Sequence, residues 1–294
     1  TSQTTMLKKF SQSLKDNMQN SEIIKKHNFN FNKKFGQNFI FDSNLLSAIV
    51  NDADVEFYEN VLEIGTGAAT LTKQIAKKAK KVVSFEIDKN LAPIIEENLA
   101  GVTNATVKFN DIMKVPMEEI ENNFNGNYVI IANLPYYITT PIIFKFLENA
   151  TRLKQLVIMV QKEVAERIVA KEGTKEYGAI TAQINTVANS CITRIVNRNM
   201  FMPAPNVDSA ILKITFCDKG FNILNKELLN KVIASAFSMR RKTLANNLKM
   251  AFSLNAETIN NLLKTLELPI DVRGEKLTAK QFVELSNLIY EIKN

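Results

Sequence analysis

The chain has almost none of the residues that enzymes most often use for acid–base catalysis and metal binding. His27 is the only histidine among its 294 residues, which argues against a Ser-His-Asp triad and against a site with several histidine ligands. The two cysteines, Cys191 and Cys217, show neither a pairing motif nor metal-ligand spacing, so we expect inert thiols in a reduced, cytoplasmic protein. Apolar runs are much shorter than a membrane span. We therefore expect chemistry without imidazole, metal or membrane.

Positive charge is in excess, and the excess lies at the two ends of the chain. Residues 1–50 hold seven Lys and Arg against three Asp and Glu, and residues 217–294 hold twelve against eight. The middle of the chain, residues 51–216, holds eighteen against nineteen. A near-neutral middle with basic ends favours a catalytic core between surfaces that bind a polyanion. Lysines that only improve solubility would give a similar excess.

The hydrophobic pattern divides the chain into three parts. Residues 1–20 are rich in Ser, Thr, Gln and Lys and begin at Thr1, which predicts a flexible arm from which a preceding segment has been removed. Residues 21–217 alternate short apolar runs with helical periodicity, which predicts an α/β domain on a doubly wound parallel sheet. Residues 218–294 show helical periodicity without strand-like runs, which predicts a small all-helical domain; its basic charge favours a role in binding RNA.

Individual elements follow from the same pattern. The expected strands are residues 61–64, 81–86, 105–109, 128–132 and 156–161, and the expected helices are residues 68–79, 91–99, 142–147 and 163–170. The β-rich stretches 192–196 and 209–216 predict an antiparallel hairpin at the sheet edge. Three apolar faces should build the core of the helical part: Leu228, Leu229, Val232 and Ile233; Ile259, Leu262, Leu263 and Leu266; and Phe282, Leu285, Ile289 and Ile292.

The four residues Asn133-Leu134-Pro135-Tyr136 directly follow the apolar run at 128–132. A proline cannot extend a strand ladder, so this segment should form a small pocket at the carboxyl end of the strand. The amide oxygen of Asn133 can accept from an exocyclic amine, and the ring of Tyr136 can stack on a nucleobase. The segment thus predicts a site for an amino-bearing base, although a strand that runs into a tight turn would have the same pattern.

Two glycines and two acids predict a cofactor site beside it. Gly65 and Gly67 lie between a strand and the next helix, where they let the backbone approach a ligand closely. Glu86 ends the next strand, 21 residues after Gly65, where a carboxylate can accept both hydroxyls of a ribose. Asp111 follows the third strand and could accept from an adenine amine. The incomplete dinucleotide pattern favours S-adenosylmethionine, which has no phosphate; a tight turn and a solvated cap are the simpler alternatives.

In seven separate segments the chain resembles the KsgA/RsmA type of ribosomal RNA adenine N,N-dimethyltransferases, which act on small-subunit RNA. The proline-rich segment 201–210 and the segment 240–244 are highly specific. The seven segments are Phe35-Gly36-Gln37-Asn38-Phe39, Glu63-Ile64-Gly65-Thr66-Gly67, Phe85-Glu86-Ile87-Asp88, Asn133-Leu134-Pro135-Tyr136, Gln161-Lys162-Glu163-Val164-Ala165, Phe201-Met202-Pro203-Ala204-Pro205-Asn206-Val207-Asp208-Ser209-Ala210 and Arg240-Arg241-Lys242-Thr243-Leu244.

The resemblance implies a Rossmann-like, S-adenosylmethionine-dependent methyltransferase that methylates each of two adjacent adenines twice. These adenines would lie in one hairpin loop near the 3′ end of small-subunit (16S-type) rRNA, as part of small-subunit maturation. The implied cofactor-binding residues are Asn38, Ile40, Gly65, Gly67, Glu86, Asp111 and Asn133. The implied catalytic residues are Asn133, Leu134, Pro135 and Tyr136, and the implied RNA-binding residues are Tyr136, Phe201, Arg240, Arg241 and Lys242.

Three positions depart from the family pattern. Ala69 stands where relatives usually have a third glycine, and its methyl group is expected to crowd the helix–strand contact or weaken cofactor binding slightly. Thr66 stands in place of a proline, and Tyr137 replaces an asparagine found in many relatives.

Other interpretations stay open from the sequence. An Erm-type methyltransferase would perform the same reaction on large-subunit RNA. A ribosome-assembly or transcription factor could keep the fold without catalysis, and a dehydrogenase is the weakest option because the dinucleotide pattern is incomplete. We expect a monomer whose partner is small-subunit rRNA or an immature small subunit. A cytoplasmic location is expected, with an organellar protein that has lost its transit segment as the alternative.

Overall fold

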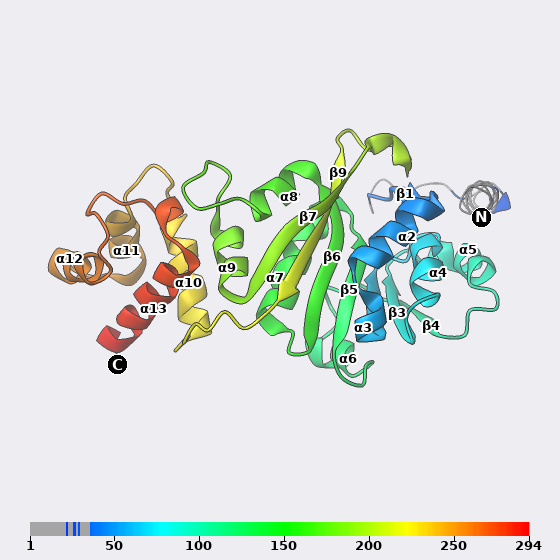
Figure 1. Ribbon diagram of the computed structural model, residues 1–294, viewed down its shortest axis with the longest axis horizontal. Helices are drawn as coiled ribbons and strands as arrows, with labels where there is room; N and C mark the ends of the chain where they lie inside the picture. Colours follow the sequence, from blue (N-terminus) through cyan, green and yellow to red (C-terminus); the bar gives the residue numbers. More distant parts are fainter. Residues whose placement is uncertain (1–21, 23–25, 28, 30–35, 294) are drawn as a thin grey trace, which may run out of the picture. The chain divides into compact units, whose positions relative to one another are not determined.

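The computed structural model describes residues 22, 26, 27, 29 and 36–293, whose helices and strands are drawn in Figure 1. The predicted arm at residues 1–20 and residue 35 of the first family-like segment lie outside the described residues. The chain forms two compact units, Thr1–Lys162 with Cys191–Thr215 and Glu163–Ser190 with Phe216–Asn294. This division differs from the expected boundary after residue 217, because residues 163–190 belong with the carboxyl-terminal helices.

The first unit is built on a seven-stranded sheet with the strand order β4-β3-β2-β5-β6-β9-β7. β2 pairs in parallel with β3 and β5, β3 pairs in parallel with β4, and β5 pairs in parallel with β6, whereas β9 pairs antiparallel with β6. The strands are β2 (Asn60–Ile64), β3 (Lys81–Glu86), β4 (Ala105–Phe109), β5 (Tyr128–Asn133), β6 (Leu153–Gln161), β7 (Ala188–Val196) and β9 (Ser209–Phe216). The predicted doubly wound parallel sheet is confirmed.

Chain connections on the two sides of β2 run in opposite directions along the sheet. The chain passes from β2 to β3 and β4 on one side and returns to β5 and β6 on the other. In open α/β sheets such a reversal leaves a crevice at the carboxyl ends of the strands, where ligands bind. β9 and β7 lie side by side at the far edge, where the two β-rich stretches were expected, and β9 separates β7 from β6.

Apolar side chains hold the sheet between helices. In one core, Leu46 and Ile49 of α2 (Ser43–Asp52) pack with Ile75 of α4 (Thr70–Ala76) and with Val129 and Ile131 of β5. Alternate residues of a strand face the same side, so the residues between them face the opposite layer. The first five residues of β5 are all buried, as expected for a central strand covered on both faces. The remaining elements of this unit are α3 (Val55–Tyr58), η2 (Lys89–Leu91), α5 (Ala92–Asn98), α6 (Met117–Glu121), η3 (Tyr136–Ile138), α7 (Thr139–Asn149) and η4 (Arg198–Met200).

A two-stranded pair outside the main sheet was not predicted. β1 (Phe39–Ile40) pairs antiparallel with β8 (Phe201–Met202), with Phe39 opposite Met202 and Ile40 opposite Phe201. The pair ties the start of the described chain to the proline-containing segment that precedes β9. Ile40 and Phe201 are both buried in the core that α2 and α4 cover.

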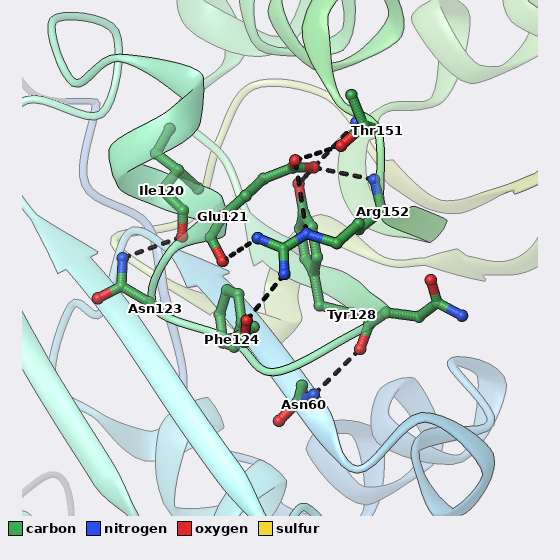
Figure 2. A network of polar contacts seen from close by, with 9 residues as sticks. Asn60, Ile120, Glu121, Asn123, Phe124, Tyr128, Thr151 and Arg152 are labelled. Carbon is green, nitrogen blue, oxygen red and sulfur yellow. Dashed lines mark hydrogen bonds and ion pairs between the residues drawn. The ribbon is translucent and has the colours of Figure 1, made fainter.

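A polar network closes the amino ends of β5 and β6 (Figure 2). Glu121, at the end of α6, accepts from the Thr151 hydroxyl at 2.6 Å, from the backbone N–H groups of Thr151 and Arg152 at 2.9 and 3.0 Å, and from the Tyr128 hydroxyl at 3.2 Å. The Arg152 guanidinium donates to the carbonyl oxygens of Glu121 and Phe124 at 2.6 and 3.0 Å. Burial opposes ionisation of Glu121, but the four hydrogen bonds hold its pKa below the usual value.

The second unit is all-helical, drawn partly in yellow to red in Figure 1. Its elements are α8 (Lys162–Ile168), α9 (Ala179–Val187), α10 (Lys226–Ala236), α11 (Leu244–Phe252), α12 (Ala256–Thr265), η5 (Gly274–Lys276) and α13 (Ala279–Lys293). α9 packs against both α10 and α13, which is why residues 163–190 belong to this unit. None of the described helices is both long and apolar enough to cross a membrane.

The predicted apolar faces build the core of this unit, with one correction. Ile292 is 51% exposed, because it lies in the last turn of α13, so the third face ends one turn earlier than expected. The core also includes Tyr177, which the faces did not predict: its ring lies 5.8 Å from that of Phe237, and its hydroxyl donates to the Leu277 carbonyl at 3.1 Å. Gly274 lets η5 approach α10 closely, because a Cβ there would lie 2.5 Å from the Ala236 carbonyl oxygen.

Candidate functional site

A cavity lies at the carboxyl ends of β2, β3 and β5, where the sheet order reverses. Its wall also includes Gly36–Ile40, the residues after β4 and the 3-10 helix η3. All seven predicted cofactor-binding residues line it: Asn38, Ile40, Gly65, Gly67, Glu86, Asp111 and Asn133. The predicted catalytic residues Leu134, Pro135 and Tyr136 line it as well, whereas Phe201, Arg240, Arg241 and Lys242 do not.

The loop after β2 brings its backbone close to the cavity. Gly65 has φ +82° and Gly67 has φ +55°, values in the left-handed region that favour glycine. A Cβ on Gly65 would lie 3.5 Å from the Asn133 carbonyl oxygen, and a Cβ on Gly67 would lie 3.2 Å from the ring of Phe39. A side chain would therefore be strained at either position, and at Gly67 it would also press on the Phe39 ring.

Ala69 also adopts the left-handed conformation, with φ +60°, directly before α4. It is fully buried in an apolar cluster with Ala68, Leu91 and Phe39. The methyl group is accommodated by apolar neighbours, so the cost of alanine at this position comes from the backbone conformation. Such strain at a non-glycine residue costs on the order of 1–2 kcal/mol.

A buried chain of hydrogen bonds joins the glycine loop to β2 and β3. The Thr66 hydroxyl lies 2.6 Å from the Ser84 hydroxyl, which donates to Glu63 Oε2 at 2.6 Å. The Thr72 hydroxyl donates to the same oxygen at 2.6 Å. Thus the residue that replaces the family's proline connects the loop to a carboxyl group in the middle of the sheet.

Glu63 is an acid that the sequence-based search for site residues passed over. Its side chain is completely buried, and Oε1 has no hydrogen-bond partner among the described residues. Burial raises the pKa of Glu63 to about 8, although the hydrogen bonds from Ser84 and Thr72 act in the opposite direction. The carboxyl group is therefore mainly neutral at pH 7. The sequence feature that could have identified Glu63 is an acid inside an apolar strand, two residues before Gly65.

Glu86 is held by the backbone around it. Its Oε2 accepts from the Gly67 N–H at 2.8 Å, and its Oε1 accepts from the N–H groups of Ile87 and Asp88, both at 2.9 Å. Burial raises the pKa of Glu86, and these three backbone hydrogen bonds lower it in part. A carboxylate has about four acceptor positions, so about one is left for a hydroxyl donor in the cavity.

Asp111 lies just after the carboxyl end of β4, in the wall of the same cavity. Its Oδ1 accepts from the Met113 N–H at 3.0 Å, and its side chain is 24% exposed. Oδ2 lies 3.9 Å from the Lys114 ammonium, outside hydrogen-bond distance. Asp111 thus has an acceptor available at the cavity wall, as the interpretation as an adenine partner requires.

The amino-terminal segment and β5 are joined by Asn133. Its side-chain nitrogen donates to the Asn38 carbonyl at 2.8 Å, which fixes the amide plane and leaves its oxygen as an acceptor. The Asn38 side chain donates to the Gly36 carbonyl at 3.2 Å, and the Thr70 hydroxyl donates to the Ile40 carbonyl at 2.8 Å. Three hydrogen bonds therefore position the segment that holds Asn38 and Ile40, two of the implied cofactor-binding residues.

Tyr136 is anchored by β9, the strand that runs antiparallel to β6. Its hydroxyl lies 2.9 Å from that of Ser209, a fully buried residue at the start of β9. Burial raises the pKa of Tyr136, and the Ser209 contact lowers it in part. Phe201, which the resemblance implied as an RNA-binding residue, is only 6% exposed and packs in the core.

The three predicted cations lie in the second unit, in the turn between α10 and α11, and all are exposed. Arg240 donates to the carbonyl oxygens of Lys175 and Tyr177 at 2.6 and 3.2 Å. Arg241 and Lys242 make no side-chain hydrogen bond or ion pair with any described residue. The structure therefore separates one cation with a structural role from two that are available to a ligand.

Several cavity residues were not assigned a role from the sequence. Ile87 and Ile112 line the cavity directly after Glu86 and Asp111, and Gln37 donates to Asp88 at 2.8 Å. An apolar residue after each acid at a strand end was the signal that could have found the first two. Within the described part of the chain, no three or more His, Cys, Asp and Glu side chains are grouped to hold a metal ion.

The cavity fits S-adenosylmethionine in its chemistry. Glu86 and Asp111 offer carboxylate acceptors for hydroxyl and amine donors, while Ile87 and Ile112 offer apolar surface. The two glycines at positive φ bring the main chain of the loop to the cavity wall. The charge of the acids also suits a cofactor with a positive sulfonium centre and no phosphate.

Comparison with known proteins decides the family. The family model described as ribosomal RNA adenine dimethylase matches residues 28–291. The chain belongs to this family. The predicted enzyme class is thereby confirmed: the protein is an rRNA adenine dimethyltransferase whose methyl donor is S-adenosylmethionine.

Curated relatives of this dimethylase match across almost their whole length. Proteins named ribosomal RNA small subunit methyltransferase A are 41% identical in Clostridioides difficile, covering 91% of this chain and 94% of that protein, and 42% identical in Lactococcus lactis, covering 92% and 94%. A dimethyladenosine transferase from Plasmodium falciparum has a TM-score of 0.68 at 27% identity, covering 82% of this chain and 94% of that one. The 23S rRNA methyltransferase ErmE shares the fold, with a TM-score of 0.66 at 23% identity, covering 86% and 100%.

Proposed function

We propose that this dimethylase acts on two adjacent adenines in a hairpin loop near the 3′ end of small-subunit rRNA, and thereby contributes to small-subunit maturation. The names of the relatives that are 41–42% identical support the small-subunit target. The observation that supports the chemistry best is the position of Asn133, whose amide is fixed at the cavity wall by the Asn38 carbonyl.

The proposed catalytic step depends on how Asn133 and Leu134 hold the target amine. The nitrogen lone pair of adenine is delocalised into the ring, so the amine is a poor nucleophile. Acceptance of its two hydrogens by Asn133 Oδ1 and the Leu134 carbonyl would localise the lone pair and direct it into the cavity. Bound S-adenosylmethionine supplies an electrophilic methyl group on a sulfonium. Orientation of this kind can lower a barrier by about 7–11 kcal/mol, which removes the need for a histidine base.

Tyr136 would hold the target base once it has left the RNA stack. Extrusion of a base costs about a few kcal/mol, and stacking on an aromatic ring returns about 1–3 kcal/mol. The Ser209 hydroxyl fixes the ring of Tyr136 by its contact with the phenol oxygen. After the first transfer the methylated nitrogen must release one proton to solvent, which leaves the amine with one hydrogen. Only one of the two acceptors is therefore used in the second transfer.

The other cavity residues are proposed to bind the cofactor. Glu86 would accept from a ribose hydroxyl, and Asp111 would accept from the adenine amine. Ile87 and Ile112 would contact the two faces of the adenine ring. Gly65 and Gly67 would let the methionine part approach the backbone, under the segment that contains Asn38 and Ile40.

The helical unit is proposed to bind RNA phosphates through Arg241 and Lys242. Both side chains are exposed and have no partner among the described residues, and exposed cations next to each other suit a polyanion. A monomer is proposed for the oligomeric state. A cytoplasmic location is supported by the bacterial relatives, whose names specify a ribosomal RNA substrate.

The first test replaces Asn133 by alanine. We expect Asn133→Ala to lower the methyl-transfer rate by about 100-fold or more, the usual effect of removing one positioned hydrogen-bonding group from an active site. Cofactor binding, measured by isothermal titration calorimetry, should remain detectable. Asn38→Ala is the matched control because it keeps the main-chain carbonyl that orients Asn133, and it should change cofactor affinity more than turnover. A normal rate for Asn133→Ala would contradict the mechanism.

The substrate is tested by supplying tritiated S-adenosylmethionine with immature small subunits and, separately, with large-subunit RNA. We expect dimethyladenosine in small-subunit RNA only, identified by nucleoside analysis. Label in large-subunit RNA would favour the ErmE-like specificity, and RNA binding without label would favour a non-catalytic role.

A further inference from the structure

Tyr137 is the most exposed aromatic side chain at the cavity. Its side chain is 62% exposed, and the residue forms part of the cavity wall next to Tyr136. Its ring lies beside Gly36, where an added Cβ would be 3.7 Å from the Tyr137 Cε1 atom. Among the described residues, Tyr137 has no hydrogen-bond partner for its hydroxyl. A large flat ring at the mouth of a site is thus left open to solvent.

Tyr136 and Tyr137 cannot serve the same base. They begin the 3-10 helix η3, in which consecutive side chains point about 120° apart because the helix has about three residues per turn. The ring of Tyr136 is directed by its contact with the buried Ser209, whereas that of Tyr137 is directed outward. The ring of Tyr136 therefore belongs to the pocket, and the ring of Tyr137 faces the space outside the cavity entrance.

We propose that Tyr137 is a further substrate-binding residue, which stacks on the nucleobase next to the adenine held in the pocket. This inference rests on the proposed function, because that substrate contains two adjacent adenines. When one adenine leaves the stack, its neighbour loses one stacking face, and an exposed aromatic ring can replace that face for any base. Tyr137 would then hold the second adenine, stacked on its ring, close to the entrance between the two rounds of methylation.

Three substitutions test the role of the ring. Tyr137→Ala should raise the Kd for an RNA hairpin, measured by fluorescence anisotropy, by about 5- to 150-fold, the range expected for loss of one base stack. Tyr137→Phe keeps the ring and should bind RNA like the unmodified protein. Ile195→Ala is a matched control, since Ile195 is 53% exposed and is not part of the cavity wall, and it should leave the Kd unchanged. Equal RNA affinity for all variants would overturn the inference.

Binding and methylation are measured separately so that the two proposals can fail separately. If the unmodified protein leaves small-subunit RNA unmethylated, the proposed function is wrong, while the anisotropy measurement still tests Tyr137. If it methylates that RNA, Tyr137→Ala should increase the share of hairpins with only one dimethylated adenine, counted by mass spectrometry. An unchanged share together with an unchanged Kd would assign Tyr137 no role in substrate binding.

A tryptophan at this position gives a direct signal, because the sequence contains no tryptophan. In Tyr137→Trp, stacking of a base should quench the indole fluorescence when the RNA hairpin is added. Ile195→Trp is the control and should not be quenched. Quenching of Tyr137→Trp by S-adenosylmethionine alone, with no further change on addition of RNA, would assign the ring to the cofactor and overturn the inference.

Discussion

At the scale of single residues, Glu63 shows how burial changes the chemistry of an acid. It lies in β2 opposite Ser84 of β3, and two hydroxyl groups donate to one of its oxygens while the other has no partner among the described residues. The neutral form is therefore favoured in the folded protein. Because Thr66 belongs to the same hydrogen-bond chain, the ionisation of Glu63 is expected to affect the loop that borders the cofactor cavity.

The pKa of Glu63 gives a prediction for stability. The folded-state pKa of about 8 lies above the ordinary value of 4.5, so its contribution to stability is complete below pH 4.5 and is lost as the pH rises toward 8. Glu63→Gln keeps the shape and cannot ionise. Relative to the unmodified protein, its free energy of unfolding should increase by up to about 1.4 kcal/mol per pH unit between pH 5 and 8.

Urea unfolding at several pH values measures this difference. Glu97→Gln is the control, because Lys26 and His27 lower the pKa of that exposed acid, and it should show no such increase. A difference between Glu63→Gln and the unmodified protein that stays constant from pH 5 to 8 would mean that Glu63 is already ionised in the folded state.

Part of the cavity wall could be predicted from the sequence, because Glu86, Asp111 and Asn133 lie at or just after the ends of parallel strands. Glu86 and Asp111 could be placed from the strand ends alone, since the carboxyl ends of parallel strands lie at one edge. The hydrogen bonding of the buried Glu63 carboxyl group could not be predicted, because it depends on the strand register that puts Ser84 opposite Glu63. The burial of Phe201 likewise follows from its pairing with Ile40, which no periodicity indicates.

At the scale of elements, the network around Glu121 fixes how α6 meets β5 and β6 (Figure 2). One carboxylate satisfies donors from Tyr128 at the start of β5 and from Thr151 and Arg152 before β6. The network lies at the strand ends opposite to Asn133. It therefore stabilises the sheet without taking part in the chemistry.

Removal of the Glu121 carboxylate should destabilise the protein strongly. Glu121→Ala leaves four donors without their acceptor and removes the negative charge 3.7 Å from the Arg152 guanidinium, at a cost of about 3–5 kcal/mol. Because the pKa of Glu121 is lowered, its contribution is present above pH 4.5 and is lost as the pH falls below that value. Denaturant unfolding at pH 7 and at pH 4 measures both effects.

Glu118→Ala is the matched control for this prediction, since Glu118 is an exposed glutamate in the same helix. Its effect should be within about 0.5 kcal/mol. If Glu121→Ala were no more destabilising than Glu118→Ala, the network would contribute nothing to stability.

Element prediction worked best where apolar runs have clear limits. The strands Lys81–Glu86, Ala105–Phe109 and Ser209–Phe216 have the predicted bounds. The pair β1–β8 was missed because two-residue strands have no period to detect. α2 was also missed, although Asp42, whose side chain accepts from the Leu45 N–H, is a typical helix-capping residue.

At the scale of the whole molecule, the chain crosses three times between its two compact units. It enters the second unit at residue 163, returns to the first at residue 191 and enters the second again at residue 216. The sequence predicted the helical character of the second unit but assigned 163–190 to the sheet domain. The reason is that α9 follows the strand–helix alternation in sequence, whereas its apolar face packs on α10 and α13.

The proposed contribution of the second unit to RNA binding is electrostatic and can be measured by salt dependence. Replacement of Arg241 and Lys242 by alanine should weaken RNA binding and reduce the slope of log K against log salt by about 0.7–0.9 per lost phosphate contact. Lys231→Ala is the control, because Lys231 is paired with Glu227 on α10. An unchanged slope in the double variant would rule out phosphate contacts at these residues.

Arg240 should behave differently from its two neighbours. Its guanidinium donates to the carbonyl oxygens of Lys175 and Tyr177. Arg240→Ala should therefore lower the melting temperature, with little change in the salt slope of RNA binding. This distinction is invisible in the sequence, where the three cations are consecutive.

The antiparallel direction of β9 has a consequence for how the site tolerates changes in chain length. Because Ser209 pairs with Gln161 at the carboxyl end of β6, the register fixes the partner of Tyr136 independently of the loop that leads into β9. Length changes between residues 203 and 207 would therefore spare both the anchor of Tyr136 and the pairing of β1 with β8.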